Sequence, residues 1–310
     1  MAVDEQKVAA IVEQVLSQLR QESSAKGRSS AGTSGMTMGK NGQFTDVDAE
    51  VKAARDAQEQ LAKMGLEVRR NAVKAMRDVT LAHLKDLAVM AHQETGLGRV
   101  EDKIAKNRLA AEKTPGPEII VPHAFTGDNG LTLTERAPYG VICSITPCTN
   151  PTETVLSNAI GMISGGNAVV INPHPTAKTT TSRFVAMLNQ AMVAAGAPDN
   201  LICAMAEPTI ESAGALMKHP GVALVVVTGG PVVVKAAMST GKKCIAAGPG
   251  NPPVVVDETA ILPRAARDII TGAGMDNNII CIVEKEIIAV EAIADRLKQE
   301  LVRAGAYLVK

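Results

Sequence analysis

Residues 222–248 read VALVVVTGGPVVVKAAMSTGKKCIAAG, and this stretch decides the fold. It opens with an apolar run rich in valine, turns at Gly229 and Gly230, continues as a helical segment and closes in a second strand-like run. A strand, a crossover helix and a second strand make up the repeating unit of a parallel sheet. The unbroken apolar character of the first run indicates a strand that is buried on both faces.

The same alternation extends upstream of this stretch. Strand-like runs at 139–146, 167–173 and 200–206 are each followed by a helical segment. Together these runs predict an α/β fold with a doubly wound, Rossmann-like parallel sheet, in which ligands bind at the carboxyl ends of the strands. No strict G-x-G-x-x-G motif is present. Gly229 and Gly230, between a strand and a helix, form a turn that can let a helix N-terminus approach a pyrophosphate. The alternative is that glycine is needed there only for the backbone conformation of the turn.

A helical region precedes the predicted sheet. From Asp46 to about Gly96, apolar residues recur at helical spacing among abundant Ala, Lys, Glu and Arg, which predicts two or three helices. The helical pattern continues until Pro115 and Gly116 interrupt it. We therefore expect helices before the sheet.

Residues 1–20 form a separate segment with a narrow apolar stripe at helical spacing. The stripe consists of Val8, Ile11, Val12, Val15, Leu16 and Leu19. Residues 21–45 are rich in Ser and Gly, which predicts a flexible linker. A tethered amphipathic helix is typical of a segment that docks on a partner, and the alternative is a helix that folds back on its own core.

Composition and charge argue against several classes of protein. The 310 residues carry 32 Lys+Arg and 32 Asp+Glu, with few aromatic residues to stack on bases, so we expect no nucleic-acid partner. The N-terminus lacks a basic n-region and no apolar run reaches about 18 residues, which predicts neither a signal peptide nor a membrane span. Five scattered cysteines predict a reducing, cytoplasmic location. Because no Cys or His pairs occur at zinc spacing, we expect no metal site.

Longer motifs resemble one family. In chain order they are ETGLGRVEDKIAKN, TGDNGLTL, ITPCTNPTETV, NAVVINPHPTAK, VVVTGG, AAGPGNPPVVVDETA and DNNIIC. Over roughly residues 46–310 the chain resembles the CoA-acylating aldehyde dehydrogenases of ethanolamine and propanediol utilisation. The resemblance implies an aldehyde dehydrogenase-like fold. It places helices and an NAD-binding domain at 46–257 and the start of a second α/β, catalytic domain at 258–310.

The resemblance also implies the site residues. Cys281 matches the nucleophile, whose thiolate attacks an aldehyde and then holds the acyl group as a thioester. Asn150 matches the asparagine that stabilises the oxyanion. The alternatives are a buried, inert thiol for Cys281 and a turn residue before Pro151 for Asn150. The residues that match NAD-binding positions are Asn172, His174, Pro175, Thr228, Gly229 and Gly230.

The substrates follow from the same resemblance. Hydrolytic aldehyde dehydrogenases carry a glutamate upstream of the cysteine to activate water, whereas this chain has Ala246 and Ala247 there. The resemblance thus implies coenzyme A as the acyl acceptor, NAD as the oxidant and a short-chain aldehyde, acetaldehyde or propanal, as the substrate. It further implies that residues 1–20 direct the enzyme to a shell protein of a bacterial microcompartment, and that the full-length form is a homo-oligomer.

The chain ends 29 residues after Cys281, whereas members of this family continue through the rest of the catalytic domain. We therefore expect a C-terminally truncated chain. Two functions stay open at this point. One is an NAD-dependent, CoA-acylating dehydrogenase, and the other is a catalytically inactive dinucleotide-binding fragment that docks in a microcompartment.

Overall fold

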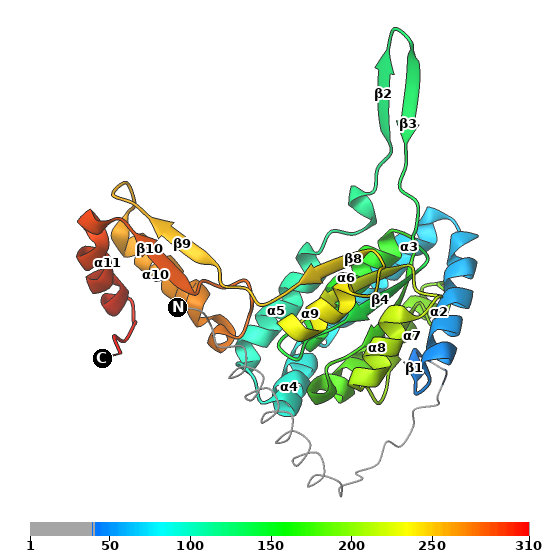
Figure 1. Cartoon of the computed structure of the whole chain (residues 1–310), viewed down its shortest axis with the longest axis horizontal. Helices are drawn as coiled ribbons and strands as arrows, with labels where there is room; N and C mark the ends of the chain where they lie inside the picture. The colour runs from blue at the N-terminus through cyan, green and yellow to red at the C-terminus, as the bar shows by residue number, and fades with distance from the viewer. Residues whose placement is uncertain (1–38, 40, 310) are drawn as a thin grey trace, which may run out of the picture. The chain divides into compact units, whose positions relative to one another are not determined.

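A six-stranded parallel sheet forms the centre of the computed structural model, which describes Gly39 and residues 41–309 (Figure 1). Its strands lie in the order β1 (Gln43–Phe44), β6 (Ile202–Met205), β5 (Ala168–Asn172), β4 (Val141–Ile145), β7 (Leu224–Thr228) and β8 (Cys244–Ala247). Each of the five predicted strand-like runs contains one of these strands, and the predicted fold class is confirmed. The predicted helix within residues 1–20 lies outside the described residues, as does most of the predicted linker. The last part of that linker segment contains β1.

Helices cover both faces of this sheet. On one face lie α2 (Val47–Ala62), α8 (Ile210–Lys218) and α9 (Pro231–Met238), and on the other lie α6 (Pro151–Ser164) and α7 (Lys178–Ala194). This division follows from right-handed crossovers, because the chain first moves from β4 to β6 and then returns past β4 to β7. Every residue of β4, β5 and β6 is buried as a result.

A further layer of helices packs outside α6 and α7. It consists of α3 (Leu66–Ala82), α4 (Leu84–Thr95) and α5 (Val100–Lys113). Residues 46–96 thus form three helices, at the upper end of the predicted number. Local sequence sets their limits. The Asp46 carboxylate accepts the Ala49 N–H at 2.8 Å to cap α2, and Gly96 ends α4 in the left-handed conformation that glycine permits.

A second set of elements follows the central sheet and has its own core. Strands β9 (Pro253–Val256) and β10 (Glu286–Ala289) pair in parallel, next to α10 (Leu262–Gly274) and α11 (Glu291–Arg303). The buried apolar residues of this core are Val256, Leu262, Ala266, Ile269, Ile293 and Leu297. It forms the start of a second α/β unit, as expected. Its first strand, β9, pairs with β10 along all four residues.

An antiparallel hairpin lies between the outer helices and the central sheet in the sequence. It is formed by β2 (His123–Gly127) and β3 (Gly130–Thr134), and all ten of these residues are exposed. No strands were predicted there from the sequence. The available signal was the turn dipeptide Asp128-Asn129, followed by Gly130, between two runs containing Phe, Leu and Thr.

Three further observations concern the described residues as a whole. None of their helices has both the length and the apolar character needed to cross a membrane. They contain no group of three or more His, Cys, Asp or Glu side chains placed to hold a metal ion. All five cysteines are free thiols.

Candidate active site

The predicted site residues follow three neighbouring strands of the central sheet. Asn150 comes after β4, Asn172 ends β5, and Thr228 ends β7. Because β4 lies between β5 and β7 in a parallel sheet, these residues share its carboxyl edge. The strand order reverses between β4 and β7, which is where doubly wound sheets bind their ligands.

The residues after β5 make contacts of their own. Asn172 is buried, and its Oδ1 accepts a hydrogen bond from Ser212 Oγ at 2.6 Å, which ties the end of β5 to α8. His174 is exposed, and its Nδ1 lies 2.9 Å from Thr176 Oγ1 and accepts the Thr176 backbone N–H. Pro175 begins the short helix η2 (Pro175–Ala177). Of these three residues, His174 and Pro175 are open to a ligand, whereas Asn172 has a structural contact.

The two glycines after β7 differ in their surroundings. A Cβ at Gly229 would lie 2.7 Å from Val233 Cγ1, and the Gly229 N–H donates to the Ala247 carbonyl at 3.1 Å. Glycine is therefore needed there for packing between strand and helix. A Cβ at Gly230 would meet no atom within 4 Å. The open side of this turn is thus at Gly230, where α9 begins.

The turn before Cys281 has an unusual backbone. Asp276, Asn277 and Asn278 lie in or beside the short helix η3 (Met275–Asn278), with φ angles of 49°, 55° and 61°. This left-handed region is disfavoured for residues other than glycine and is best tolerated by Asn and Asp. Cys281 follows in a partly buried position. The segment between β8 and β9 passes close by, since a Cβ at Gly250 would lie 1.9 Å from the Cys281 carbonyl oxygen.

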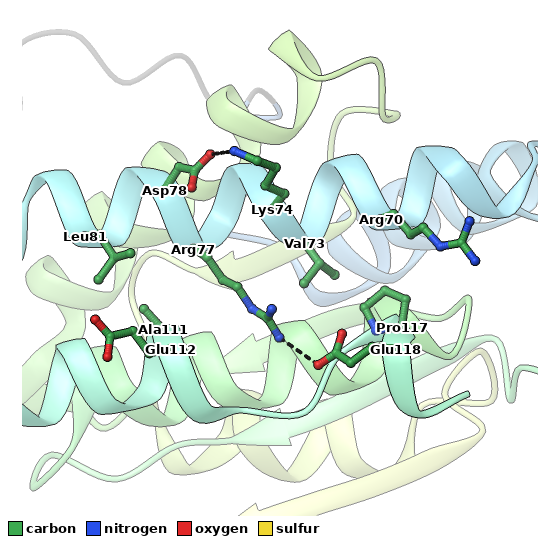
Figure 2. Close-up of a pocket in the computed structure, with 10 residues that line it drawn as sticks. All are labelled: Arg70, Val73, Lys74, Arg77, Asp78, Leu81, Ala111, Glu112, Pro117 and Glu118. Carbon is green, nitrogen blue, oxygen red and sulfur yellow. Dashed lines mark hydrogen bonds and ion pairs between the residues drawn. The ribbon is translucent and has the colours of Figure 1, made fainter. Parts of the chain in front are cut away.

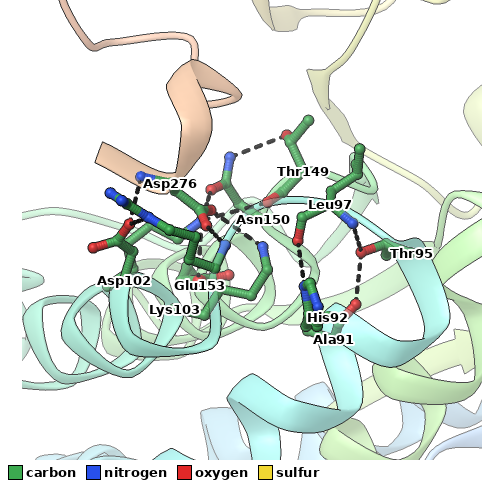
Figure 3. A network of polar contacts seen from close by, with 12 residues as sticks. Ala91, His92, Thr95, Leu97, Asp102, Lys103, Thr149, Asn150, Glu153 and Asp276 are labelled. Atoms are coloured by element: carbon green, nitrogen blue, oxygen red, sulfur yellow. Dashed lines mark hydrogen bonds and ion pairs between the residues drawn. The ribbon is translucent and has the colours of Figure 1, made fainter. Parts of the chain in front are cut away.

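A buried ion-pair network holds this turn against α5 (Figure 3). Asp276 is fully buried, and its Oδ2 lies 2.5 Å from Lys106 Nζ and 3.1 Å from Lys103 Nζ. Its Oδ1 accepts the Arg99 backbone N–H at 2.7 Å. Burial alone raises the pKa of Asp276, but the Lys106 and Arg99 hydrogen bonds and the charges of both lysines together lower it below its usual value. Asp276 is therefore an ionised anchor.

The same network reaches the predicted oxyanion residue. Lys106 Nζ donates to Asn150 Oδ1 at 2.7 Å and lies 3.4 Å from Glu153 Oε1. One ammonium group thus joins the loop after β4 to the turn that carries Cys281. Lys103, Lys106 and Asp276 were not among the site residues predicted from the sequence. The spacing of the two lysines on one helix face was visible, but lysines on a helix are usually solvated and their buried partner lies about 170 residues away.

The cysteines fall into two groups by burial. Cys143 in β4 and Cys203 in β6 are fully buried, and their burial, together with the nearby Glu50 carboxyl group, raises the pKa of both thiols. Such thiols are unreactive. Cys148, Cys244 and Cys281 are partly exposed, and burial also raises the pKa of Cys244. Of the three, Cys281 is the one that follows the anchored turn.

A hollow of about 400 Å³ lies elsewhere, beside α3, α5 and the short helix η1 (Pro117–Ile119) (Figure 2). None of the predicted site residues lines it. Its cations are matched by carboxylates, since Arg77 pairs with Glu118 at 3.1 Å and Lys74 with Asp78 at 2.5 Å. Because these charges are paired with each other, they are less available to bind a ligand. The carboxyl edge of the sheet is therefore the better candidate for the binding site.

Known enzymes are similar to this chain over most of its length. An acetylating acetaldehyde dehydrogenase of Salmonella typhimurium is 51% identical over 275 residues, which cover 88% of this chain and 58% of the relative. A CoA-propanoylating propanal dehydrogenase of Citrobacter freundii is 43% identical over 266 residues, covering 86% of this chain and 58% of the relative. The chain therefore spans little more than half the length of these relatives.

Solved structures agree with this result. The propionaldehyde dehydrogenase of Rhodopseudomonas palustris, solved with bound CoA and an acylated cysteine, gives a TM-score of 0.84 at 51% identity. The alignment covers 87% of this chain and 62% of that one. The predicted resemblance is confirmed. The profile of the aldehyde dehydrogenase family matches residues 26–309, and the chain belongs to this family.

Proposed function

We propose that this chain supplies the NAD-binding region and the nucleophile of a CoA-acylating aldehyde dehydrogenase. The reaction is the oxidation of a short-chain aldehyde, acetaldehyde or propanal, to the acyl-CoA through a thioester on Cys281. The observation that carries the proposal is the bridge from Asn150 through Lys106 to Asp276, five residues before Cys281. The relatives named above act on acetaldehyde and propanal, which supports this substrate class.

The carboxyl edge of the sheet fits a dinucleotide. His174 and Pro175 are exposed beside the end of β5, and Gly230 leaves open space at the start of α9. Backbone N–H groups at a helix N-terminus suit a pyrophosphate. NAD, when bound, supplies the hydride acceptor. The residues that we propose to hold it are Asn172, His174, Pro175, Thr228, Gly229 and Gly230.

The chemistry assigned to the chain's own residues starts with attack of the Cys281 thiolate on the aldehyde carbonyl carbon. The carbonyl oxygen becomes an oxyanion, which accepts hydrogen bonds from Asn150 Nδ2 and from the Cys281 backbone N–H. Loss of hydride from this adduct leaves a thioester on Cys281. The thiolate of CoA then attacks the thioester carbon, the C–S bond to Cys281 breaks, and Cys281 departs as the thiolate.

The chain offers no carboxylate at the position that activates water in hydrolytic relatives. Ala246 and Ala247 end β8, and their methyl side chains have no group that can accept a proton. A thioester that is not attacked by activated water persists until a thiol arrives. This is our reason for proposing CoA, rather than water, as the acyl acceptor.

The test is an assay of the purified chain for aldehyde-dependent NADH formation, with and without CoA. We expect acyl-CoA and NADH in equal amounts when CoA is present. Without CoA we expect no more than one slow acylation per Cys281 and very little free acid. Steady acid production without CoA would refute the assignment of the acceptor. NAD binding with no acylation of Cys281 would instead support the second function, an inactive dinucleotide-binding fragment.

We also propose that residues 1–20 dock on a microcompartment shell protein. A propionaldehyde dehydrogenase from a fucose utilisation microcompartment of Clostridium phytofermentans is 48% identical to this chain, which supports the setting. The test fuses residues 1–22 to a fluorescent reporter in cells that make microcompartments. Puncta that disappear in an Ile11→Asp, Leu16→Asp control would agree with docking, and diffuse fluorescence from both fusions would refute it.

We further propose that the full-length enzyme is a homo-oligomer. Exposed apolar side chains of the hairpin support this, with Phe125 65% and Leu131 68% exposed. Apolar patches of this kind mark interfaces more often than free surface. Sedimentation of the full-length enzyme before and after Phe125→Ser and Leu131→Ser tests it. A monomer at all concentrations would argue against the proposal.

A further inference from the structure

We propose that Lys106 is a positioning residue, which fixes the amide of Asn150 so that its N–H group faces the reacting carbonyl oxygen. This inference rests on the proposed function, because it concerns the oxyanion formed on Cys281. It adds a residue that acts through Asn150 and does not itself touch the substrate.

The orientation follows from hydrogen-bond chemistry. A lysine ammonium group donates and cannot accept, so the Asn150 atom at 2.7 Å from Lys106 Nζ must be the carbonyl oxygen Oδ1. The amide nitrogen Nδ2 therefore lies on the opposite side of the amide group. One of its two hydrogens goes to Thr149 Oγ1 at 3.1 Å, which leaves the second hydrogen for a ligand. If the amide were flipped, Oδ1 would face the oxyanion and repel it.

The position of Lys106 is itself fixed. The residue is 6% exposed, and Asp276 Oδ2 holds its ammonium group at 2.5 Å while Glu153 Oε1 lies at 3.4 Å. Asp276 is in turn held by Lys103 and by the Arg99 backbone N–H. A buried ammonium with these partners has little freedom to move. Asn150 therefore receives its orientation from the same anchor that holds the turn before Cys281.

Lys103 provides a matched control on the same helix face. It precedes Lys106 by three residues, is 1% exposed and pairs with the same carboxylate oxygen at 3.1 Å. Its ammonium group hydrogen-bonds to Asp276, whereas the Lys106 ammonium group hydrogen-bonds to Asp276, to Asn150 and, at 3.4 Å, to the Thr149 backbone carbonyl oxygen. Lys103→Met therefore weakens the anchor but leaves the Asn150 contact in place. Lys106→Met weakens the anchor and also removes that contact.

Two thiol reagents distinguish a variant in which Asn150 has lost its orientation from one in which the turn before Cys281 is generally disturbed. p-Nitrophenyl acetate acetylates a thiolate through a tetrahedral oxyanion. The C–S bond forms, p-nitrophenolate leaves, and neither NAD nor aldehyde is required. Iodoacetamide alkylates the same thiolate by displacement of iodide and forms no oxyanion. The ratio of the two rate constants at Cys281, followed by mass spectrometry of the Cys281 peptide, reports stabilisation of the oxyanion. Loss of thiol access alone slows both reactions together.

We expect Lys106→Met to lower the acetylation rate at Cys281 about tenfold relative to alkylation, less than the loss expected for Asn150→Ala, which removes the donor itself. Lys103→Met should leave the ratio within about twofold of the unmodified chain. In the Asn150→Ala background, Lys106→Met should have no further effect, because both changes act on one hydrogen bond. If Lys106→Met does not fold, Lys106→Gln is measured instead. Its side chain is shorter by one atom but keeps an N–H donor, and we expect it also to lower the ratio.

Three results would overturn the inference. They are an unchanged ratio in the folded Lys106 variant, an equal change in Lys103→Met, and additive effects with Asn150→Ala. Failure of the proposed function gives a different result, since the unmodified chain would then show no acetylated Cys281 while alkylation still proceeded.

Discussion

The central sheet and the turn before Cys281 are stabilised in different ways. In the sheet, β4, β5 and β6 are buried throughout, and apolar side chains of one strand pack on those of the next and on the helices. In the turn, Asp276 is as deeply buried but is charged, and three successive residues have left-handed backbone. The sheet depends on apolar area, which many residues share. The turn depends on a few partners from α5, so single substitutions should affect it more.

The largest difference is expected between two cysteines. Cys281→Ala should abolish acyl-CoA formation in the full-length enzyme, because no other partly exposed thiol lies on the anchored turn, while NAD binding is retained. Cys143→Ala in β4 should leave turnover within about twofold and cost about 1 kcal/mol of stability, as a small buried side chain does. Initial rates and NAD titration of both variants test this. Substantial turnover by Cys281→Ala would show that Cys281 is not the nucleophile.

The next effect concerns the anchor. Asp276→Ala leaves Lys103 and Lys106 buried without their carboxylate, and such a loss costs about 3 to 5 kcal/mol. The free energy of unfolding is measured by urea denaturation. Asp268→Ala, which removes an exposed partner of Arg264 at 3.4 Å, is the control and should change stability by no more than about 0.5 kcal/mol. Equal losses in the two variants would contradict the buried network.

A smaller effect is expected from the close packing around Cys281. A methyl group at Gly250 would lie 1.9 Å from the Cys281 carbonyl oxygen, so Gly250→Ala must shift one of the two backbone segments at a cost of about 1 to 3 kcal/mol. The rate of Cys281 alkylation should change as well. Gly214→Ala in α8 meets no atom within 4 Å and should stabilise the helix by up to about 1 kcal/mol. The melting temperatures of the two variants are compared by thermal unfolding. If Gly214→Ala destabilises the chain and Gly250→Ala does not, the prediction is wrong.

The smallest effect, when taken per pH unit, is a pH dependence that arises where α2 packs on the central sheet. Glu50 in α2 is fully buried and accepts the Ile171 backbone N–H at 3.2 Å, and burial raises its pKa well above the usual value despite this bond. The folded chain thus holds the Glu50 proton more tightly than the unfolded chain does. The stability that results is fully present below the unfolded pKa of about 4.3 and is lost as pH rises through the folded pKa.

The slope expected from Glu50 is at most about 1.4 kcal/mol per pH unit. Glu50→Gln keeps an acceptor for Ile171 and removes the titration, so it should flatten this part of the stability profile and stabilise the chain at the alkaline end. Urea denaturation across this pH range measures the difference. Parallel profiles for the two proteins would show that Glu50 does not contribute.

The contrast between sheet and turn also explains which features were predictable. The strands β4 to β8 follow from runs such as NAVVINP, because parallel strands that are covered on both faces need apolar residues throughout. The anchor was not predictable from pattern. Lys103 and Lys106 are ordinary residues for a helix surface, and their burial depends on Asp276, which is distant in the sequence. The strands β9 and β10 were missed for a related reason, since each pairs with the other across an intervening helix and most of their residues are not buried.

The position of β1 has a consequence for the order of events during synthesis. Gln43 pairs with Ala204, so about 160 residues must be made before the partner of β1 exists. At a translation rate of about 5 to 20 residues per second, β1 waits roughly 8 to 30 seconds for β6. Late in that interval, once they have been made, β4, β5 and their helices can assemble on the ribosome, whereas Gln43 and Phe44, which end up buried, remain unpaired. The first strand in the chain therefore joins the sheet only after β4, β5 and β6 have been made.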